Sequence, residues 1–212
     1  MPSNVLSFSD SLARVRDLLN DTDRRIIIGI VGKPGAGKST LSSYLLENLP
    51  KDLVSLVPMD GYHLSNKVLD ELERRDRKGA PDTFDSEGYS ALIDRIARSR
   101  DDVYFPIFHR EIEESIAAEG VVTKSTRIVL TEGNYLLHDE GGWKKVQNSL
   151  DETWFVEVDE STRLKRLVQR HHHFGKSLQE AFDWAHGTDQ RNAEIVENAR
   201  NQADFIVINE GN

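Results

Sequence analysis

Residues 26–39 read IIIGIVGKPGAGKS. The first six form a β-branched run broken only by Gly29, which is typical of a strand buried on both faces of a parallel sheet. Residues 32–39 follow at once and match the pattern G-x-x-x-x-G-K-[ST] at every fixed position. Apolar side chains then recur at helical spacing over residues 39–49. A strand, a glycine-rich loop and a helix in this order predict a phosphate-binding loop.

Each position of this loop has a physical role. Glycines allow a tight turn that aims successive backbone N–H groups at one anion. Lys38 supplies a mobile charge to the β- and γ-phosphates of a nucleotide, and Ser39 offers a hydroxyl to Mg²⁺. The following helix presents its positive end to the same phosphates. We therefore expect ATP and Mg²⁺ as cofactors, with the nucleotide bound by Gly32, Lys33, Pro34, Gly35, Ala36, Gly37, Lys38, Ser39 and Thr40.

Strands and helices alternate through the rest of the chain. Apolar runs predict further strands at residues 53–57, 128–130, 154–158 and 205–208. Helical spacing predicts helices within 1–22, where Ser9 or Asp10 is the expected cap, and at 39–48, 86–98, 161–171 and 178–201. This alternation predicts a three-layer α/β/α fold with a five-stranded parallel sheet. A weaker apolar stretch at 103–108 is a candidate for a short extra strand.

The composition excludes several classes of function. The chain has 212 residues, enough for one well-buried core, so we expect a single domain over residues 1–212. A formal net charge of −9 disfavours nucleic acid and anionic membranes as partners. The chain has no cysteine, and no run approaches the ~20 apolar residues of a membrane span. Residues 1–10 lack the pattern of a signal peptide, so we expect a cytoplasmic protein.

Two predicted strands end in a carboxylate followed by glycine. Asp60 comes after the strand at 53–57, and Glu132 comes after the strand at 128–130. Ligands of open parallel sheets lie beyond the carboxyl ends of the strands. If both strands flank the strand at 26–31, these acids converge near the γ-phosphate. Asp60 is then our candidate for the base that deprotonates a substrate hydroxyl, and Glu132 for the Mg²⁺ shell, with Asp60 a second metal candidate. Alternatively, each acid only caps a turn.

A basic helix follows the fourth of these strands. Arg163, Arg166 and Arg170 recur at i, i+3 and i+7, which places them along one helix face. Gly175 is suited to end the helix, so the segment around residues 163–177 is a candidate lid over the phosphates. A solvated basic face is the alternative. The run His171-His172-His173 does not favour a metal site, because neighbours in a helix point about 100° apart.

These motifs together resemble a known family. The sequence is similar to the P-loop kinases grouped as phosphoribulokinase, uridine kinase and type I pantothenate kinase, and most similar to small bacterial members labelled fructose-transport-system or nucleoside/nucleotide kinases. The resemblance covers residues 26–208. It rests on the loop at 32–39, on PMDGYHL at 58–64, on RKGAPDTFD at 77–85, on TEGNYLL at 131–137 and on the lid arginines.

The resemblance implies roles for individual residues. The fold would be nucleoside-kinase-like, and the activity would be transfer of the γ-phosphate of ATP to a small-molecule hydroxyl. The catalytic residues would be Asp60, Lys38, Glu132, Arg166 and Arg170. The acceptor would be pantothenate-, nucleoside- or sugar-like and would lie against Tyr62, His63, Lys78, Asp82, Phe84, Arg110 and Tyr135.

Departures from the family and competing hypotheses leave the acceptor open. His109 stands where uridine kinases carry an acid, and Arg110 indicates an anionic or polyhydroxyl acceptor, or only a structural ion pair. A GTPase would need N-K-x-D, but the nearest string, residues 66–69, ends in Leu69. A nucleotide-gated binding protein without acceptor phosphorylation is the alternative to a kinase. The oligomeric state also stays open, although a homodimer is the commonest assembly of soluble enzymes.

Overall fold

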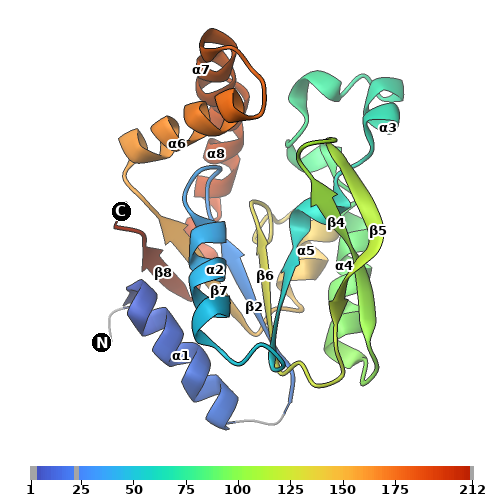
Figure 1. The fold of residues 1–212 in the computed structure, drawn as a ribbon, viewed down its shortest axis with the longest axis vertical. Helices are drawn as coiled ribbons and strands as arrows, with labels where there is room; N and C mark the ends of the chain where they lie inside the picture. The colour runs from blue at the N-terminus through green and yellow to red at the C-terminus, as the bar shows by residue number, and fades with distance from the viewer. Residues whose placement is uncertain (1–3, 22–23, 211–212) are drawn as a thin grey trace.

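The centre of the protein is a parallel β-sheet. The computed structural model describes residues 4–21 and 24–210. Within these ranges the main sheet has six strands, which lie side by side and all run parallel (Figure 1). Their order across the sheet is β1 (Val5–Leu6), β8 (Phe205–Ile208), β7 (Glu152–Glu157), β2 (Ile26–Val31), β6 (Ile128–Gly133) and β3 (Val54–Pro58).

The α/β fold class is confirmed, and the strand count needs a correction. The sixth strand is β1, which has only two residues, lies at the edge of the sheet and pairs with β8 through Val5 and Ile206. Two residues carry no periodic pattern, so this strand left no signal in the sequence. The expected neighbours of β2 are also partly wrong, because β6 lies between β2 and β3.

Helices cover both faces of this sheet (Figure 1). Their bounds are α1 (Phe8–Asp21), α2 (Lys38–Asn48), α3 (Asn66–Glu71), α4 (Ser86–Arg98), α5 (Gly141–Gln147), α6 (Glu160–His173), α7 (Leu178–His186) and α8 (Thr188–Asn198). The cap of α1 is Ser7 and not Ser9 or Asp10, because the Ser7 hydroxyl accepts a hydrogen bond from the Asp10 N–H. In turn, the Asp10 carboxylate accepts a hydrogen bond from the Ser7 N–H at 2.9 Å.

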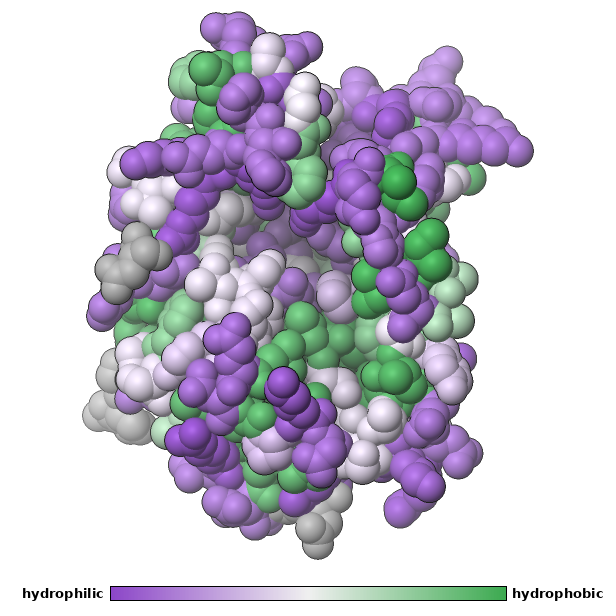
Figure 2. Space-filling model, viewed as in Figure 1, coloured by the Kyte–Doolittle hydropathy of each residue, from purple (hydrophilic) through white to green (hydrophobic). Residues whose placement is uncertain are grey.

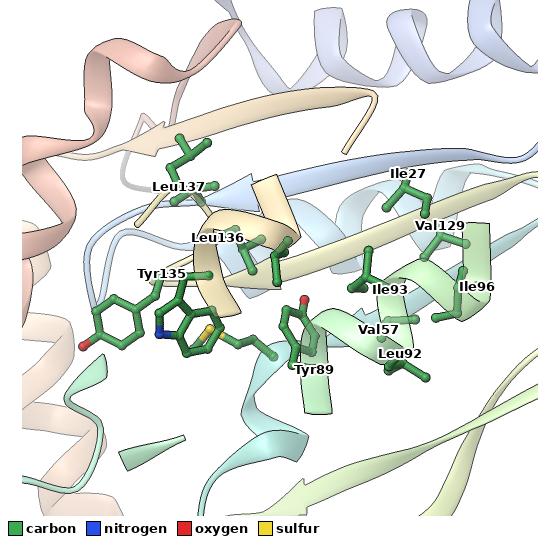
Figure 3. Close-up of a cluster of buried hydrophobic side chains, with 14 of the residues drawn as sticks. Ile27, Val57, Tyr89, Leu92, Ile93, Ile96, Val129, Tyr135, Leu136 and Leu137 are labelled. Atoms are coloured by element: carbon green, nitrogen blue, oxygen red, sulfur yellow. The ribbon is translucent and has the colours of Figure 1, made fainter. Parts of the chain in front are cut away.

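The alternation of side chains along β2 builds two cores. Ile26, Ile28 and Ile30 point to the face covered by α1 and α2, where they pack with Leu41 and Leu45. Ile27 and Val31, which alternate with them, point to the other face of the sheet, covered by α4 and α5. Figure 3 shows that second face, where the side chains of α4 lie beside those of the sheet: Ile93 and Ile96 near Ile27, Val57 and Val129. The sheet is therefore buried on both sides, as its apolar strands predict.

Two other segments differ from expectation. Residues 103–108 do form a strand, β4 (Val103–His109), but it pairs antiparallel with β5 (Glu114–Val122) in a separate hairpin. Residues 178–201 form two helices, since Gly187 separates α7 from α8 and its N–H donates to the Asp183 carbonyl. Among the residues described, no helix is both long and apolar enough to cross a bilayer.

Candidate active site

A cavity of about 750 Å³ opens at the carboxyl ends of the central strands. Figure 2 shows this hollow with largely hydrophilic walls, between the lobe of α6–α8 and the lobe of α3 and the β4–β5 hairpin. The phosphate loop and the ends of β6 and β3 form its floor. Parallel sheets bind ligands at this position, because the loops that leave the strands there can diverge around a ligand.

The phosphate loop has the backbone that its glycines predict. Gly37 precedes α2 with φ +96°, a left-handed conformation that favours glycine. A Cβ at this residue would lie 2.0 Å from the Asn209 amide nitrogen and 3.3 Å from Arg166 Nη1, so the loop needs glycine for space as well. Around it, Ala36 is buried and Thr40 is exposed. Lys33 points to the surface carboxylates of Glu160 and Glu197.

Lys38 lies inside the cavity and bonds to three oxygens. Its Nζ donates to the Gly32 carbonyl at 2.8 Å, to the Lys33 carbonyl at 3.2 Å and to Asn134 Oδ1 at 2.6 Å. Burial lowers the pKa of the Lys38 ammonium to about 8, although Glu132 and Asp60 oppose the shift. Lys38 is thus a cation held over the loop without a carboxylate in direct contact, ready for an anionic ligand.

Glu132 is held against the start of α2. Its Oε1 accepts from the Ser39 hydroxyl at 3.2 Å and its Oε2 from the Ser42 hydroxyl at 2.7 Å. Burial raises the pKa of Glu132, while the Ser42 hydrogen bond and the charge of Lys38 act against the rise. Ser39 and Glu132 thus bring a hydroxyl and a carboxylate together, the hard oxygen donors that Mg²⁺ prefers.

Asp60 lies in the same cavity within a shell of positive charge. Its Oδ2 is 2.9 Å from Arg110 Nη2. Burial alone would raise the pKa of Asp60, but the charges of His63, Arg110, Lys38 and Arg170 outweigh it and hold the pKa below its ordinary value. Asp60 and Glu132 therefore converge as expected, although their strands do not both flank β2, because the register sets Pro58 opposite Glu132.

The arginines of α6 have three different environments. Arg163 is fully buried and donates to the Pro34 carbonyl at 3.1 Å and to Glu160, so it is a structural residue and not part of a basic face. Arg170 lines the cavity. Arg166 Nη1 is buried beside Gly37 and has no hydrogen-bond partner among the described residues. An orphaned guanidinium nitrogen next to a phosphate loop fits a phosphate oxygen of ATP.

The end of α6 and its three histidines are well defined. The Gly175 N–H donates to the His172 carbonyl and the Lys176 N–H to the His171 carbonyl, and Gly175 has φ +99°. This is a Schellman cap, and Gly175 therefore ends the helix as predicted. The histidine rings diverge: His171 bonds to Asp189 and His172 to the Lys176 carbonyl, while the exposed His173 packs against Phe174.

The predicted acceptor residues divide into two groups. Cavity-lining residues are His63, Lys78, Phe84 and Arg110. The others lie elsewhere: Tyr62 packs on Tyr89, Asp82 pairs with Arg77 at the surface, and the buried Tyr135 donates its hydroxyl to the Gly79 carbonyl at 2.5 Å. His109 also faces away from the cavity, because its ring is bound between Glu111 and Glu119 of the hairpin.

Several cavity residues were missed or misplaced by sequence reasoning. Asn134 accepts a hydrogen bond from Lys38, and Ser42 donates one to Glu132. Neither residue was singled out as a site residue from the sequence. Asp189 and Asn192 fall within the helix predicted at 178–201 and carried no motif of their own, but both are at least nine-tenths buried and line the cavity. Both residues lie in the first half of α8, directly after the break at Gly187.

The comparisons with known proteins agree with this geometry. The pattern of the Phosphoribulokinase / Uridine kinase family matches residues 27–210. The chain belongs to this family. A crystal structure of a protein from Silicibacter sp. TM1040, whose proposed role is a fructose transport system kinase, has 35% identity and a TM-score of 0.85, covering 95% of this chain and 98% of that one.

Two curated relatives extend the comparison. C227.14 of Schizosaccharomyces pombe, whose proposed activity is that of a uridine kinase, is 29% identical and covers 96% of this chain and 91% of that protein. The ATP-dependent kinase YFH7 of Saccharomyces cerevisiae is 26% identical over 74% of this chain and 55% of that protein. This family member is thus a P-loop kinase, a phosphotransferase that binds ATP.

Proposed function

We propose that this family member transfers the γ-phosphate of ATP to a hydroxyl group of a small metabolite, with Asp60 as the base. One observation carries the proposal. The Asp60 carboxylate is held ionised in the same cavity as the phosphate-loop residues Lys38 and Ser39. A carboxylate so placed can accept the proton of an acceptor hydroxyl next to the bound triphosphate.

The reaction balances with these groups. Asp60 takes the hydroxyl proton as the acceptor oxygen bonds to the γ-phosphorus, and the bond from that phosphorus to the β,γ-bridging oxygen breaks to leave ADP. Lys38, Arg166 and Arg170 are the candidates to stabilise the phosphate oxygens with positive charge, since Lys38 and Arg170 line the cavity and Arg166 Nη1 is buried beside the phosphate loop. Ser39, Glu132 and Asp60 are the candidates to hold Mg²⁺, which would neutralise charge on the β- and γ-phosphates when bound.

The lobe of α6–α8 is suited to act as the lid of this kinase. Arg170 and Lys176 line the cavity from this lobe, and the turn at Gly175 is the hinge candidate. The acceptor class stays a proposal: pantothenate-, nucleoside- or sugar-like. A cytoplasmic location, a single domain and a homodimer also remain predictions.

The testing experiment measures ADP release from Mg-ATP with a panel of hydroxyl acceptors: pantothenate, uridine, cytidine, nicotinamide riboside, fructose and other sugars. We expect one of them to stimulate ADP release far above background. Asp60→Asn should then lower turnover about 10²–10⁴-fold, because it removes a general base. ATP affinity, measured by calorimetry, should change by less than about threefold, because Asp60 contacts the acceptor rather than the nucleotide.

The matched control is Asp94→Asn on α4. Asp94 makes an exposed ion pair with Arg98 far from the cavity lining, and such pairs contribute little. An equal loss of ATP binding and turnover in Asp60→Asn would make Asp60 a metal ligand instead. Tight ATP binding without stimulation by any acceptor would favour a nucleotide-gated binding protein.

A further inference from the structure

Another buried carboxylate, Asp189, lines the same cavity. Asp189 stands in the first turn of α8, is only 7% exposed and lines the same cavity as Asp60. Asn192, one helical turn further on, is 4% exposed and lines it too. The Asn192 amide donates to the Gly79 carbonyl at 3.3 Å. The phosphate-transfer step does not use Asp189, so the position of this carboxylate requires another explanation.

The Asp189 carboxylate is oriented by a lid residue. His171 Nε2 lies 2.6 Å from Asp189 Oδ2, and both side chains are at least four-fifths buried. This is the single hydrogen bond recorded for the Asp189 side chain among the described residues, so the second oxygen keeps its capacity to accept. A buried carboxylate oxygen beside a cavity is costly unless a ligand or water bonds to it.

The charges around Asp189 narrow the chemistry of its ligand. Arg170, Arg110, Asp189 and Asp60 all line this cavity. Burial and the charge of Arg110 lower the pKa of Arg170, whereas the charges of Asp189 and Asp60 act against that shift. Charges of both signs are therefore mixed in this cavity, and a ligand of either charge would meet both attraction and repulsion. A hydroxyl group satisfies both surroundings, because it donates to a carboxylate and accepts from a guanidinium or an amide.

The aromatic residues that line the cavity also suit a small ligand with hydroxyl groups. Trp184 lines the cavity from the lid lobe and Phe108 from the hairpin, so the cavity has flat apolar surfaces on two sides. Between them lie the amide of Asn192 and the carboxylates. Small-molecule sites typically combine aromatic walls with a small number of polar groups that fix the orientation of the ligand.

We propose that Asp189, oriented by His171, accepts a hydrogen bond from an acceptor hydroxyl other than the one that is phosphorylated. The inference rests on the proposed kinase function. Asp189 is a specificity residue that touches the acceptor, and His171 is a positioning residue that acts through it.

The experiment pairs acceptors that differ by one hydroxyl. Steady-state ADP release is measured for D-ribose against 2-deoxy-D-ribose, uridine against 2′-deoxyuridine, and fructose against its monodeoxy analogues. For the acceptor that is used, one deoxy analogue should raise the acceptor KM about 10–100-fold in the wild type, since a buried charged acceptor loses its partner. Asp189→Asn should raise the KM of the full acceptor by a similar factor and abolish the discrimination. Neither kcat nor the ATP KM should change more than about threefold.

Two variants separate recognition from folding. His171→Gln keeps a donor for Asp189 and should retain most of the acceptor affinity, whereas His171→Ala should not. The matched control is Asp183→Asn, an exposed carboxylate of α7 outside the cavity lining. An unchanged acceptor KM in Asp189→Asn, or a fall in kcat alone, would overturn the inference and leave the kinase intact. A panel in which no acceptor stimulates ADP release would overturn both.

Discussion

Lys38 shows how the free protein is prepared for an anion. Its ammonium is buried among carbonyl and amide oxygens, and its pKa is lowered to about 8. The triphosphate of ATP favours the charged form, so binding must raise this pKa again. Near pH 8 the free protein is about half protonated at Lys38 and the complex fully so, which means that ATP binding takes up about half a proton at this pH.

This linkage predicts a pH dependence with a defined sign. Above pH 8, ATP affinity should fall by up to about tenfold per pH unit, because the neutral amine must first be protonated. Calorimetry at pH 8 in two buffers of different ionisation enthalpy should report the proton uptake, and at pH 6.5 the uptake at Lys38 should vanish. Lys38→Met should lose both the uptake and ATP-dependent turnover while remaining folded. Equal proton uptake in this variant would assign the titration to another group.

At the scale of elements, one buried side chain ties three segments together. Arg163 of α6 donates to the Pro34 carbonyl in the phosphate loop, to Glu160 in its own helix and to Gln190 of α8. The lid lobe and the phosphate loop are therefore not independent. The spacing of the arginines indicated one basic face, but Arg163 turns inward while Arg170 reaches the cavity.

Breaking this connection should affect stability and nucleotide binding together. Arg163→Met keeps the bulk but leaves the Pro34 carbonyl and Gln190 without their donor. We expect a loss of about 1–3 kcal/mol in the free energy of unfolding and weaker ATP binding. Lys165→Met, an exposed position on the same helix, is the control and should be nearly neutral. Denaturant titration and calorimetry measure the two effects, and a stability loss without any change in ATP affinity would contradict the coupling.

The contrast between elements explains what a sequence can predict here. β2 and α4 were predicted to the residue, because each has a strong pattern and clear ends. The two-residue β1 and the break at Gly187 depend on tertiary contacts and were missed. The motif of the phosphate loop can likewise be found in the sequence because its residues are contiguous, whereas Asp189 is brought to the cavity only by the tertiary fold.

At the scale of the whole molecule, one sheet supports two cores and a lobe, and each contains one tryptophan. Trp154 on β7 lies in the core under α1 and α2, and Trp143 on α5 lies in the core on the other face. Trp184 lies on α7 beside the cavity, where Lys176 Nζ is 4.5 Å from its ring centroid. Since every central strand contributes side chains to both cores, neither core can lose its packing while the other keeps it.

Cooperative unfolding of the two cores follows from this arrangement, and it tests the prediction of a single domain. In variants that keep one tryptophan and replace the other two by phenylalanine, the fluorescence midpoints of Trp143 and Trp154 in urea should each coincide with the circular-dichroism midpoint of the same variant. The fluorescence of Trp184 should report the same transition. It should also respond to Mg-ATP at urea concentrations well below the midpoint, because Trp184 lines the cavity. A Trp143 transition separated from the circular-dichroism transition would mean that the α5 face unfolds as an independent unit, and the single-domain prediction would be wrong.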